Sequence, residues 1–149
     1  MERWQADLKS LFESEGVDKS GEKKASEVRS HIKKFYSGKV KTVFRKLKKE
    51  LEKYGREVNV MVGDRSGSIE VNCQGRLELD YKIKVRDIYP YPEALYQDAS
   101  GNRIWSEGSF REGIEKYNIY DIPEDAILGN FLREYKSRLW ALSRQEGLF

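Results

Sequence analysis

The chain has 149 residues, of which 38% are hydrophobic, 12% aromatic and 36% charged, and it carries a formal net charge of +3. This length suffices for one domain with a real hydrophobic core, and the aromatic content argues against intrinsic disorder. One cysteine, Cys73, and one histidine, His31, exclude a disulfide framework within the chain and any metal site that needs several cysteines or imidazoles.

Residues 1–55 are predicted to be helical. A first helix is expected from Glu2 to Glu15, where apolar residues recur at helical spacing, and Gly16 ends it. These apolar residues are Trp4, Leu8, Leu11 and Phe12. A polar connector is expected over residues 17–21, and a second helix then continues to Tyr54 and ends at Gly55.

The second helix carries two apolar stripes that do not share one face. The upstream stripe consists of Ala25, Val28, Ile32, Phe35 and Tyr36, and the downstream stripe of Val40, Val43, Phe44, Leu47, Leu51 and Tyr54. On a helical projection their centres differ by roughly 80°. The stripes meet at Ser37-Gly38, where we expect a kink or break that brings both onto one surface.

From Glu57 the apolar residues alternate with polar ones, which predicts antiparallel strands. The first three strands are expected over residues 58–62, 69–73 and 77–85, separated by turns at 63–67 and 74–75. The segment Asp87–Pro92 is expected to break the ladder, because Pro90 and Pro92 cannot donate hydrogen bonds. A hairpin over 94–97 and 103–107 and a last strand from Glu115 to Tyr120 complete the sheet.

A C-terminal helix is predicted to start at Asp121-Ile122-Pro123-Glu124, which combines a capping carboxylate with a proline in the first turn. Its apolar face holds Ile127, Phe131, Tyr135, Leu139 and Leu142. We therefore predict an α+β fold: a short helix and a long, kinked, basic helix, a five- or six-stranded antiparallel meander, and a C-terminal helix packed on one sheet face. Residues 1–149 are expected to form one domain, with a helical part (1–55) and a sheet with its helix (56–149).

The residues that could carry catalysis follow no recognisable pattern. His31 is interpreted as a histidine of a helix surface, and Cys73 as a small hydrophobe on the apolar side of a strand. Three carboxylates are expected on the polar faces of neighbouring strands: Glu70, Glu78 and Asp80. Glu78 and Asp80 alternate with Lys82, Lys84 and Arg86, which is typical of cross-strand charge pairing on an exposed sheet face. Segment 63–68 contains two glycines but no helix follows it, so it is not a phosphate loop. We predict that the protein is not an enzyme and has no cofactor or metal.

The segment 28–49 contains nine lysines and arginines and no acidic residue. Removing these nine from the 28 basic residues leaves 19 against 25 acidic residues, so a basic segment is joined to a mildly acidic body. Ordinary exposed helices mix charges to gain pairs four residues apart. The alternatives are therefore contact with an acidic protein surface (the chain's own body included), contact with nucleic-acid phosphates, or an exposed face without a partner. The candidate contact residues are Lys34, Lys41, Arg45, Lys48 and Lys49.

Aromatic residues around the proline segment form a second candidate surface. Tyrosine and proline in a stiff loop give contact area at low entropic cost. The alternative is a loop that buries these rings over an open end of the sheet. The candidate partner-contact residues are Tyr89, Tyr91, Tyr96 and Trp105.

These patterns predict a protein that acts by binding. We expect a small interaction or regulatory module that engages a protein partner and self-associates as a homo-oligomer through its N-terminal helices. The alternative is a nucleic-acid-associated accessory protein, and a lesser variant has a cavity for an apolar ligand between the sheet and the C-terminal helix. No apolar run approaches the roughly 18 residues of a membrane span, and Met1–Trp4 do not open a signal peptide, so we expect a cytoplasmic protein without a membrane partner.

Overall fold

A computed structural model describes the backbone of residues 2–14, 17–97, 100–111 and 116–145, and within these ranges the side chains of 10–14, 17–23 and 144–145 are not described. The chain divides into two units, Met1–His31 and Ile32–Phe149. The first unit holds α1 (Arg3–Ser14) and most of α2 (Val17–Phe35), which confirms two helices in this region. The polar connector expected over residues 17–21 is wrong, because α2 already begins at Val17. None of the residues 17–20 breaks a helix, and a glycine at position 21 costs a helix interior only about 1 kcal/mol.

In the second unit, α2 continues into a π-helical turn, η1 (Tyr36–Val40), and then into α3 (Lys41–Glu52). A π turn holds one residue more than an α turn, so it shifts the faces of the helix by about 100°. This shift is close to the roughly 80° between the two predicted stripes. The irregularity expected at Ser37-Gly38 is therefore the π turn, and it allows Phe35 and Tyr36 to be buried together with Val40.

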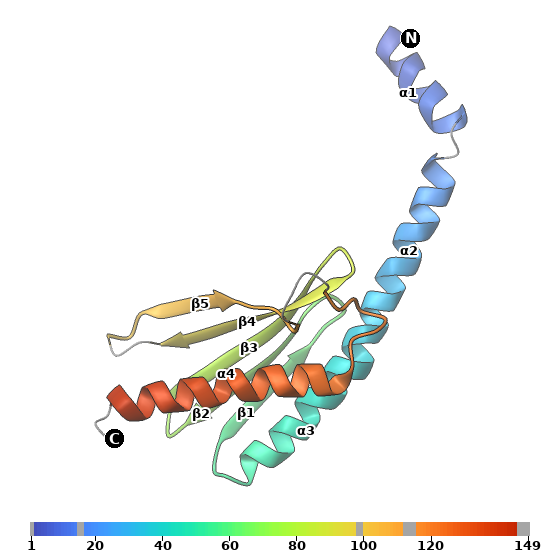
Figure 1. Cartoon of the computed structure of the whole chain (residues 1–149). Helices are drawn as coiled ribbons and strands as arrows, with labels where there is room; N and C mark the ends of the chain where they lie inside the picture. Colours follow the sequence, from blue (N-terminus) through green and yellow to red (C-terminus); the bar gives the residue numbers. More distant parts are fainter. Residues whose placement is uncertain (1, 15–16, 98–99, 112–115, 146–149) are drawn as a thin grey trace. The chain divides into compact units, whose positions relative to one another are not determined.

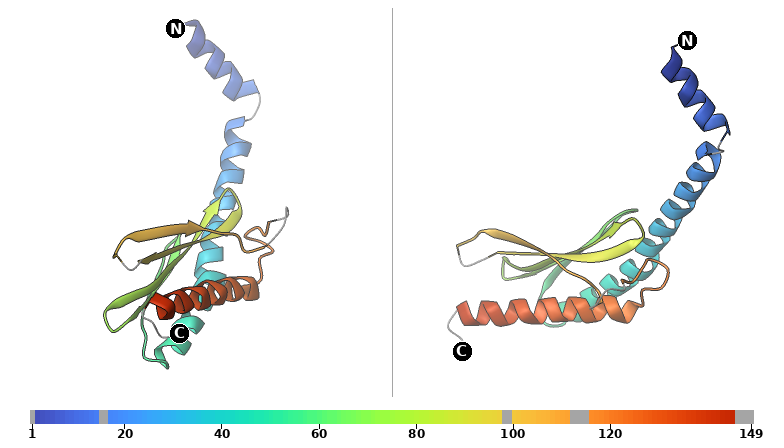
Figure 2. Two further views of the ribbon diagram at one scale, coloured as in Figure 1. Left: turned by 60° about the vertical axis from the view of Figure 1, so that its left-hand side comes forward. Right: turned by 45° about the horizontal axis from the view of Figure 1, so that its top comes forward.

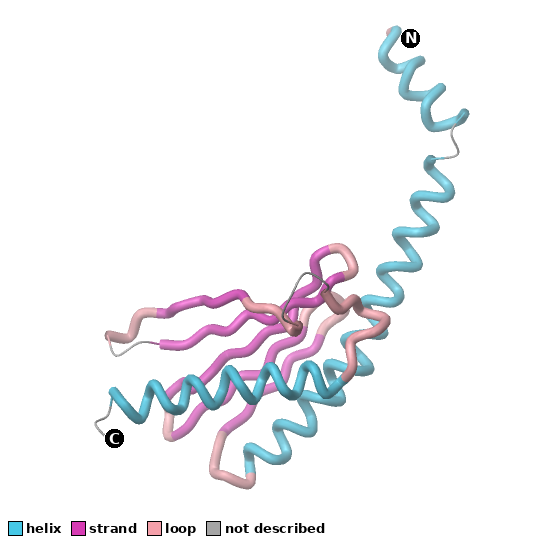
Figure 3. The backbone as a smooth tube through the Cα atoms, in the orientation of Figure 1, coloured by secondary structure: helices cyan, strands magenta, loops and turns pink. Residues whose placement is uncertain are grey.

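The sheet is an antiparallel meander whose strand order equals the sequence order (Figures 1 and 3). Its strands are β1 (Glu57–Val62), β2 (Gly67–Cys73), β3 (Arg76–Arg86), β4 (Tyr89–Gln97) and β5 (Arg103–Glu107). The described residues thus form a five-stranded sheet, which confirms the lower of the two expected strand numbers.

The two prolines do not break the ladder, contrary to expectation. Both lie inside β4, where Pro90 is paired with Val85 and Pro92 with Ile83. The carbonyl of Pro92 points away from β3, because it accepts a hydrogen bond from Gly108 N at 2.9 Å. In an antiparallel strand the nitrogen and carbonyl of one residue point to the same side. Both proline nitrogens therefore face the β5 side of β4. The pairing of β4 with β5 begins only at Glu93, beyond the two prolines, so no hydrogen-bond donor of the ladder is missing.

The strand expected from Glu115 to Tyr120 does not form over its described part, residues 116–120. Ile119 is buried and donates one backbone hydrogen bond to Ile88 O at 2.9 Å. The neighbouring polar side chains close a turn instead, because Asn118 Oδ1 accepts hydrogen bonds from the backbone of Tyr120 and Asp121. Glu115 lies outside the described residues.

The C-terminal helix, α4 (Glu124–Gln145), begins later than expected and without the predicted cap. The Asp121 carboxylate accepts a hydrogen bond from Asn118 N at 2.8 Å and thus completes the preceding turn. The predicted apolar face of α4 is confirmed, since Ile127, Phe131 and Tyr135 are buried.

Both α3 and α4 pack on one face of the sheet, α3 on β1 and β2 and α4 on β3 and β4 (Figures 1 and 2). Tyr81 of β3 lies between them. Its ring is 6.3 Å from that of Phe44 in α3 and 5.2 Å from that of Phe131 in α4, both edge to face. The opposite face of the sheet carries charged and polar side chains together with several aromatic ones, and none of the described helices packs on it. For this face we use the name open face.

Candidate functional site

Helix α3 presents its basic residues from a fixed position, because its other side is part of the core. Val43 and Phe44 are fully buried and Leu47 is 6% exposed. Tyr54, predicted to lie on the same stripe, is 71% exposed, because α3 ends at Glu52. The stripe is thus confirmed for the helix itself and wrong for the residue beyond its end.

Several of the predicted contact residues have no acidic partner among the residues that the structure describes. Within the described part of the chain, none of four exposed or half-buried cations forms an ion pair: Lys34, Lys41, Arg45 and Lys49. The fifth, Lys48, is 3.8 Å from Glu52. The positive charge of α3 is therefore only partly neutralised by neighbouring carboxylates of the chain.

The cations of α3 lie on two flanks of the helix. At about 100° per residue, Lys41, Arg45 and Lys48 follow one flank, and Lys46 lies on the other. Lys46 is 4.0 Å from Glu124, the first residue of α4, so its flank faces α4. The first three residues, which we call the basic row, consequently lie on the side away from α4. Because α3 packs over β1 and β2, this is the side of the β1 edge.

The remaining predicted cations lie outside the basic row. Lys49 projects opposite the buried side of α3, next to the row. Lys34 lies on α2, and the π turn separates it from α3. The structure thus brings three of the five candidates into one row.

On the open face of the sheet the cations are mostly paired. Lys84 Nζ is 3.1 Å from Glu93, and Arg86 Nη2 donates to Glu107 Oε1 at 3.0 Å. Lys82 lies over the Trp105 ring at 4.6 Å. Cross-strand charge pairs therefore occur on this face, but not at the predicted carboxylates, because Glu70 lies opposite Asp80 in the register. The pairs leave less free positive charge on this face than on α3.

The four aromatic candidates do not form one surface. The strand register places Tyr89, Tyr91 and Trp105 on the open face, where Tyr89 and Trp105 are 43% and 48% exposed. Tyr96 lies on the helix-covered face, with the Arg138 guanidinium of α4 at 4.7 Å from its ring. One of the four is therefore a packing residue.

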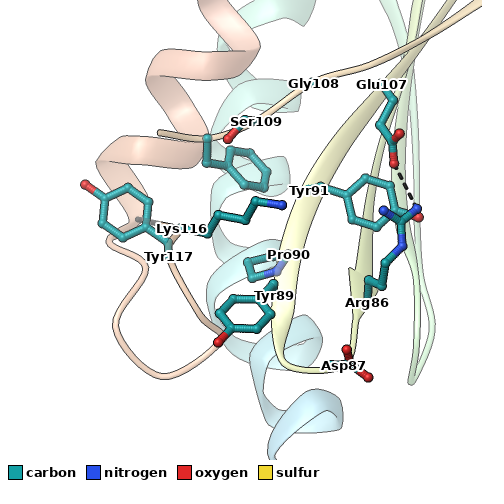
Figure 4. A pocket seen from close by; sticks show the side chains of 11 residues that line it. Arg86, Asp87, Tyr89, Pro90, Tyr91, Glu107, Gly108, Ser109, Lys116 and Tyr117 are labelled. Carbon is teal, nitrogen blue, oxygen red and sulfur yellow. Dashed lines mark hydrogen bonds and ion pairs between the residues drawn. The ribbon is translucent and has the colours of Figure 1, made fainter. Parts of the chain in front are cut away.

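A cavity of about 370 Å³ lies at the end of the β3–β4 hairpin (Figure 4). Its polar groups include Arg86, which also stacks on Tyr91 at 4.7 Å, and Lys116, whose side chain extends toward Tyr91. The other lining residues are Asp87, Tyr89, Pro90, Glu107, Gly108, Ser109, Phe110 and Tyr117. Since Glu107 holds Arg86, the cavity is a mixed polar and aromatic site without an excess of one charge.

Glu78 is not on the polar face of the sheet, contrary to expectation. Val71 pairs with Leu79 and Asn72 with Leu77, so Glu78 is an extra residue of β3 opposite β2. Such a bulge re-aims a side chain, and Glu78 is turned to the helix-covered face, 5% exposed. The sequence carried no signal for the bulge, because apolar and polar residues alternate without interruption along β3.

Buried tyrosines complete the polar contacts of the core. Tyr135 OH donates to Glu78 Oε1 at 2.6 Å, and Tyr81 OH donates to Asn130 Oδ1 at 2.5 Å. Burial raises the pKa of Tyr135, and the hydrogen bond to Glu78 raises it further. Burial also raises the pKa of Tyr81 and Tyr36, whose hydroxyl donates to Ile83 O at 2.9 Å. These phenols are neutral donors that fix the helices on the sheet.

The described residues contain no group of three or more histidine, cysteine or acidic side chains that could hold a metal ion. Cys73 is half-buried and His31 is exposed on α2. None of the helices in the described ranges has the length and apolar character needed to cross a membrane. Comparisons of the chain with protein-family models, with curated proteins and with solved structures found no match.

Proposed function

We propose that this chain is a non-catalytic binding module that engages an acidic surface of a partner protein through α3. The observation that carries the proposal is the basic row together with Lys49. These residues project from a helix whose other side is buried in the core, and three of the four, Lys41, Arg45 and Lys49, form no ion pair among the described residues. A row of cations on a rigid helix attracts an acidic partner at little cost in backbone entropy.

A nucleic-acid backbone is the second candidate, because the same exposed cations suit phosphates. Segment 28–49 contains no Asn or Gln for base reading, so such binding would depend on charge and not on sequence. The two candidates differ in their preferred polyanion.

The proposal is tested with two labelled probes, a 20-residue poly-L-glutamate and a 20-base-pair DNA duplex of random sequence. Fluorescence anisotropy at low and high salt gives the affinity for each. We expect poly-glutamate to bind and to be released by salt, since exposed charges are screened. Tighter binding of the duplex at equal salt would favour the nucleic-acid function, and binding of neither probe at low salt would refute both.

A double charge reversal, Lys41→Glu with Arg45→Glu, should weaken poly-glutamate binding at least tenfold. The matched control is Arg133→Glu with Lys136→Glu, which reverses two exposed cations on α4 and changes the net charge equally. An equal loss in both variants would show that only the net charge of the protein matters.

Self-association through the N-terminal helices is a further part of the proposal. It is supported by α1, in which Trp4 and Leu8 are 56% and 46% exposed, four residues apart on one face. We expect the full chain to form a dimer that Trp4→Glu with Leu8→Glu dissociates, whereas Gln5→Glu does not. Sedimentation equilibrium measures this, and a monomeric wild-type chain would contradict it.

A further inference from the structure

The outer edge of β1 is open to another strand. β1 is the first strand of the sheet, and β2 is the only described strand paired with it (Figure 1). Gly63 N donates to Ser66 O at 2.9 Å at the end of the β1–β2 hairpin. Because hydrogen-bonded and non-bonded pairs alternate in an antiparallel ladder, Asn59 and Met61 bond to β2. The backbone N–H and C=O groups of Val58, Val60 and Val62 therefore point outward.

β1 lacks the features that usually protect a sheet edge. Proteins block such edges with proline, lysine, bulges or very short strands. The sequence of β1, Glu-Val-Asn-Val-Met-Val, has no proline or lysine, and its register with β2 is continuous. The opposite edge strand, β5, has five residues and begins and ends with Arg103 and Glu107. β1 is therefore the edge better suited to accept a strand.

The cations of α3 beside the β1 edge determine which kind of strand can pair with β1. The basic row of α3 (Lys41, Arg45 and Lys48) lies on the side of β1. Two copies of the chain paired edge to edge would bring their basic rows toward each other across the two-fold axis, which like-charge repulsion opposes. An acidic strand would instead face the row with opposite charge.

We propose that an extended acidic segment of a partner protein adds to β1 as a sixth strand. Alternate residues of an added strand point to opposite faces. Those on the helix-covered side are acidic and contact the basic row, and those on the open face are apolar and lie near Met61, which is 73% exposed. The inference rests on the proposed function. It adds to that function the backbone contacts that the acidic partner makes and the alternation of acidic and apolar residues in the partner's strand.

The first test compares two labelled peptides of ten residues, both alternating valine and glutamate. One consists of L residues, and in the other every valine is the D form, so the charge and composition are equal but a regular ladder with β1 is prevented. We expect the all-L peptide to bind the full chain at least tenfold more tightly. Equal affinities, with poly-glutamate binding intact, would overturn the added strand and leave the proposed function standing.

Amide hydrogen exchange of the full chain locates the bound peptide directly. The amides of Val58, Val60 and Val62 should exchange at least tenfold more slowly when the all-L peptide is saturating, whereas amides of β5 should not change. An unchanged rate at these three valines would overturn the proposal. Protection of the same amides before peptide is added, in a chain that sediments as a dimer, would show that a second copy occupies the edge, which also overturns it.

Val60→Pro removes one outward N–H without touching the ladder to β2. We expect this variant to lose the preference for the all-L peptide while it still binds poly-glutamate. The control, Val60→Thr, keeps the N–H and the branched shape and should retain the preference. The exchange measurement on the wild-type chain decides the proposal if Val60→Pro fails to fold. Loss of poly-glutamate binding in Lys41→Glu with Arg45→Glu tests the proposed function separately.

Discussion

Glu78 accepts two parallel hydrogen bonds from the guanidinium of Arg56, at 2.9 Å from Nε to Oε1 and 3.1 Å from Nη2 to Oε2. Tyr135 donates a third to the same carboxylate. The carboxylate thus joins the residue before β1, the bulge of β3 and helix α4. Since α3 ends only a few residues before Arg56, this contact also helps to hold the C-terminal end of α3 on the sheet.

Glu78→Gln should destabilise the fold by about 1.5–3 kcal/mol, the usual value of hydrogen bonds to a charged group. The substitution keeps the shape but leaves Arg56 and Tyr135 with a weaker acceptor in a site that is only 5% exposed. Urea unfolding measures the loss. The control is Glu107→Gln, which removes an exposed pair with Arg86 and should cost less than about 1 kcal/mol. Equal losses would show that burial adds nothing to the Glu78 contact.

Gly67→Ala should destabilise the fold by about 1–3 kcal/mol, as overpacking of a core does. A Cβ at Gly67 would lie 2.8 Å from Val40 Cγ1 of η1, closer than packed side chains allow. Thermal unfolding measures the effect. In a Val40→Ala background the same glycine substitution should cost little, because the clashing methyl group is gone. A full additive loss in the double variant would contradict the steric explanation.

The amphipathic patterns were sufficient to predict most of the fold. The apolar positions of α4 and the alternation of β2 and β3 gave elements that the structure confirms. The phase shift between the two stripes around Ser37-Gly38 required an irregular helix, and the π turn supplies a rotation of nearly that size. Local periodicity is a strong signal because each buried face must follow the geometry of its own element.

The features that depend on a neighbouring strand were not predictable. Pro90 and Pro92 are tolerated in β4 because of the side to which their nitrogens point, which only the register reveals. Glu78 is buried because of a bulge opposite Val71 and Asn72. The candidate site likewise combines a predictable and an unpredictable feature. The excess of cations was visible in the sequence, whereas the position of the basic row beside the β1 edge follows from the packing of α3 on the sheet.

Deletion of Gly38 should prevent native packing of the helical segment. Removing one residue would convert the π turn to α-helical geometry and rotate the upstream helix by about 100°. Phe35 and Tyr36, which are buried, would then leave the core. Near-UV circular dichroism and urea unfolding should show lost tertiary packing. Gly38→Ala keeps the register and meets no atom within 4 Å, so it should be neutral or stabilising by up to about 1 kcal/mol. A deletion variant as stable as Gly38→Ala would contradict this account of the turn.

Asp80→Asn should stabilise the fold at neutral pH and lose this effect in acid. Asp80 lies half-buried on the open face, where burial, only partly offset by Lys82, raises its pKa, and Glu70 raises it further. The folded state therefore holds the proton more tightly than the unfolded state, so the stability of the wild-type chain falls as pH rises between the two pKa values. Asparagine removes this loss.

Urea unfolding at pH 7 and at about pH 3, below the usual aspartate pKa near 3.9, tests the sign. The stability difference between Asp80→Asn and the wild-type chain should be positive at pH 7 and shrink toward zero at the lower pH. Glu57→Gln, at an exposed carboxylate of β1, serves as the control and should change stability by no more than about 0.5 kcal/mol. If Asp80→Asn were destabilising at pH 7, the contacts of Asp80 with Lys82 and Arg103 would outweigh the cost of burying its charge.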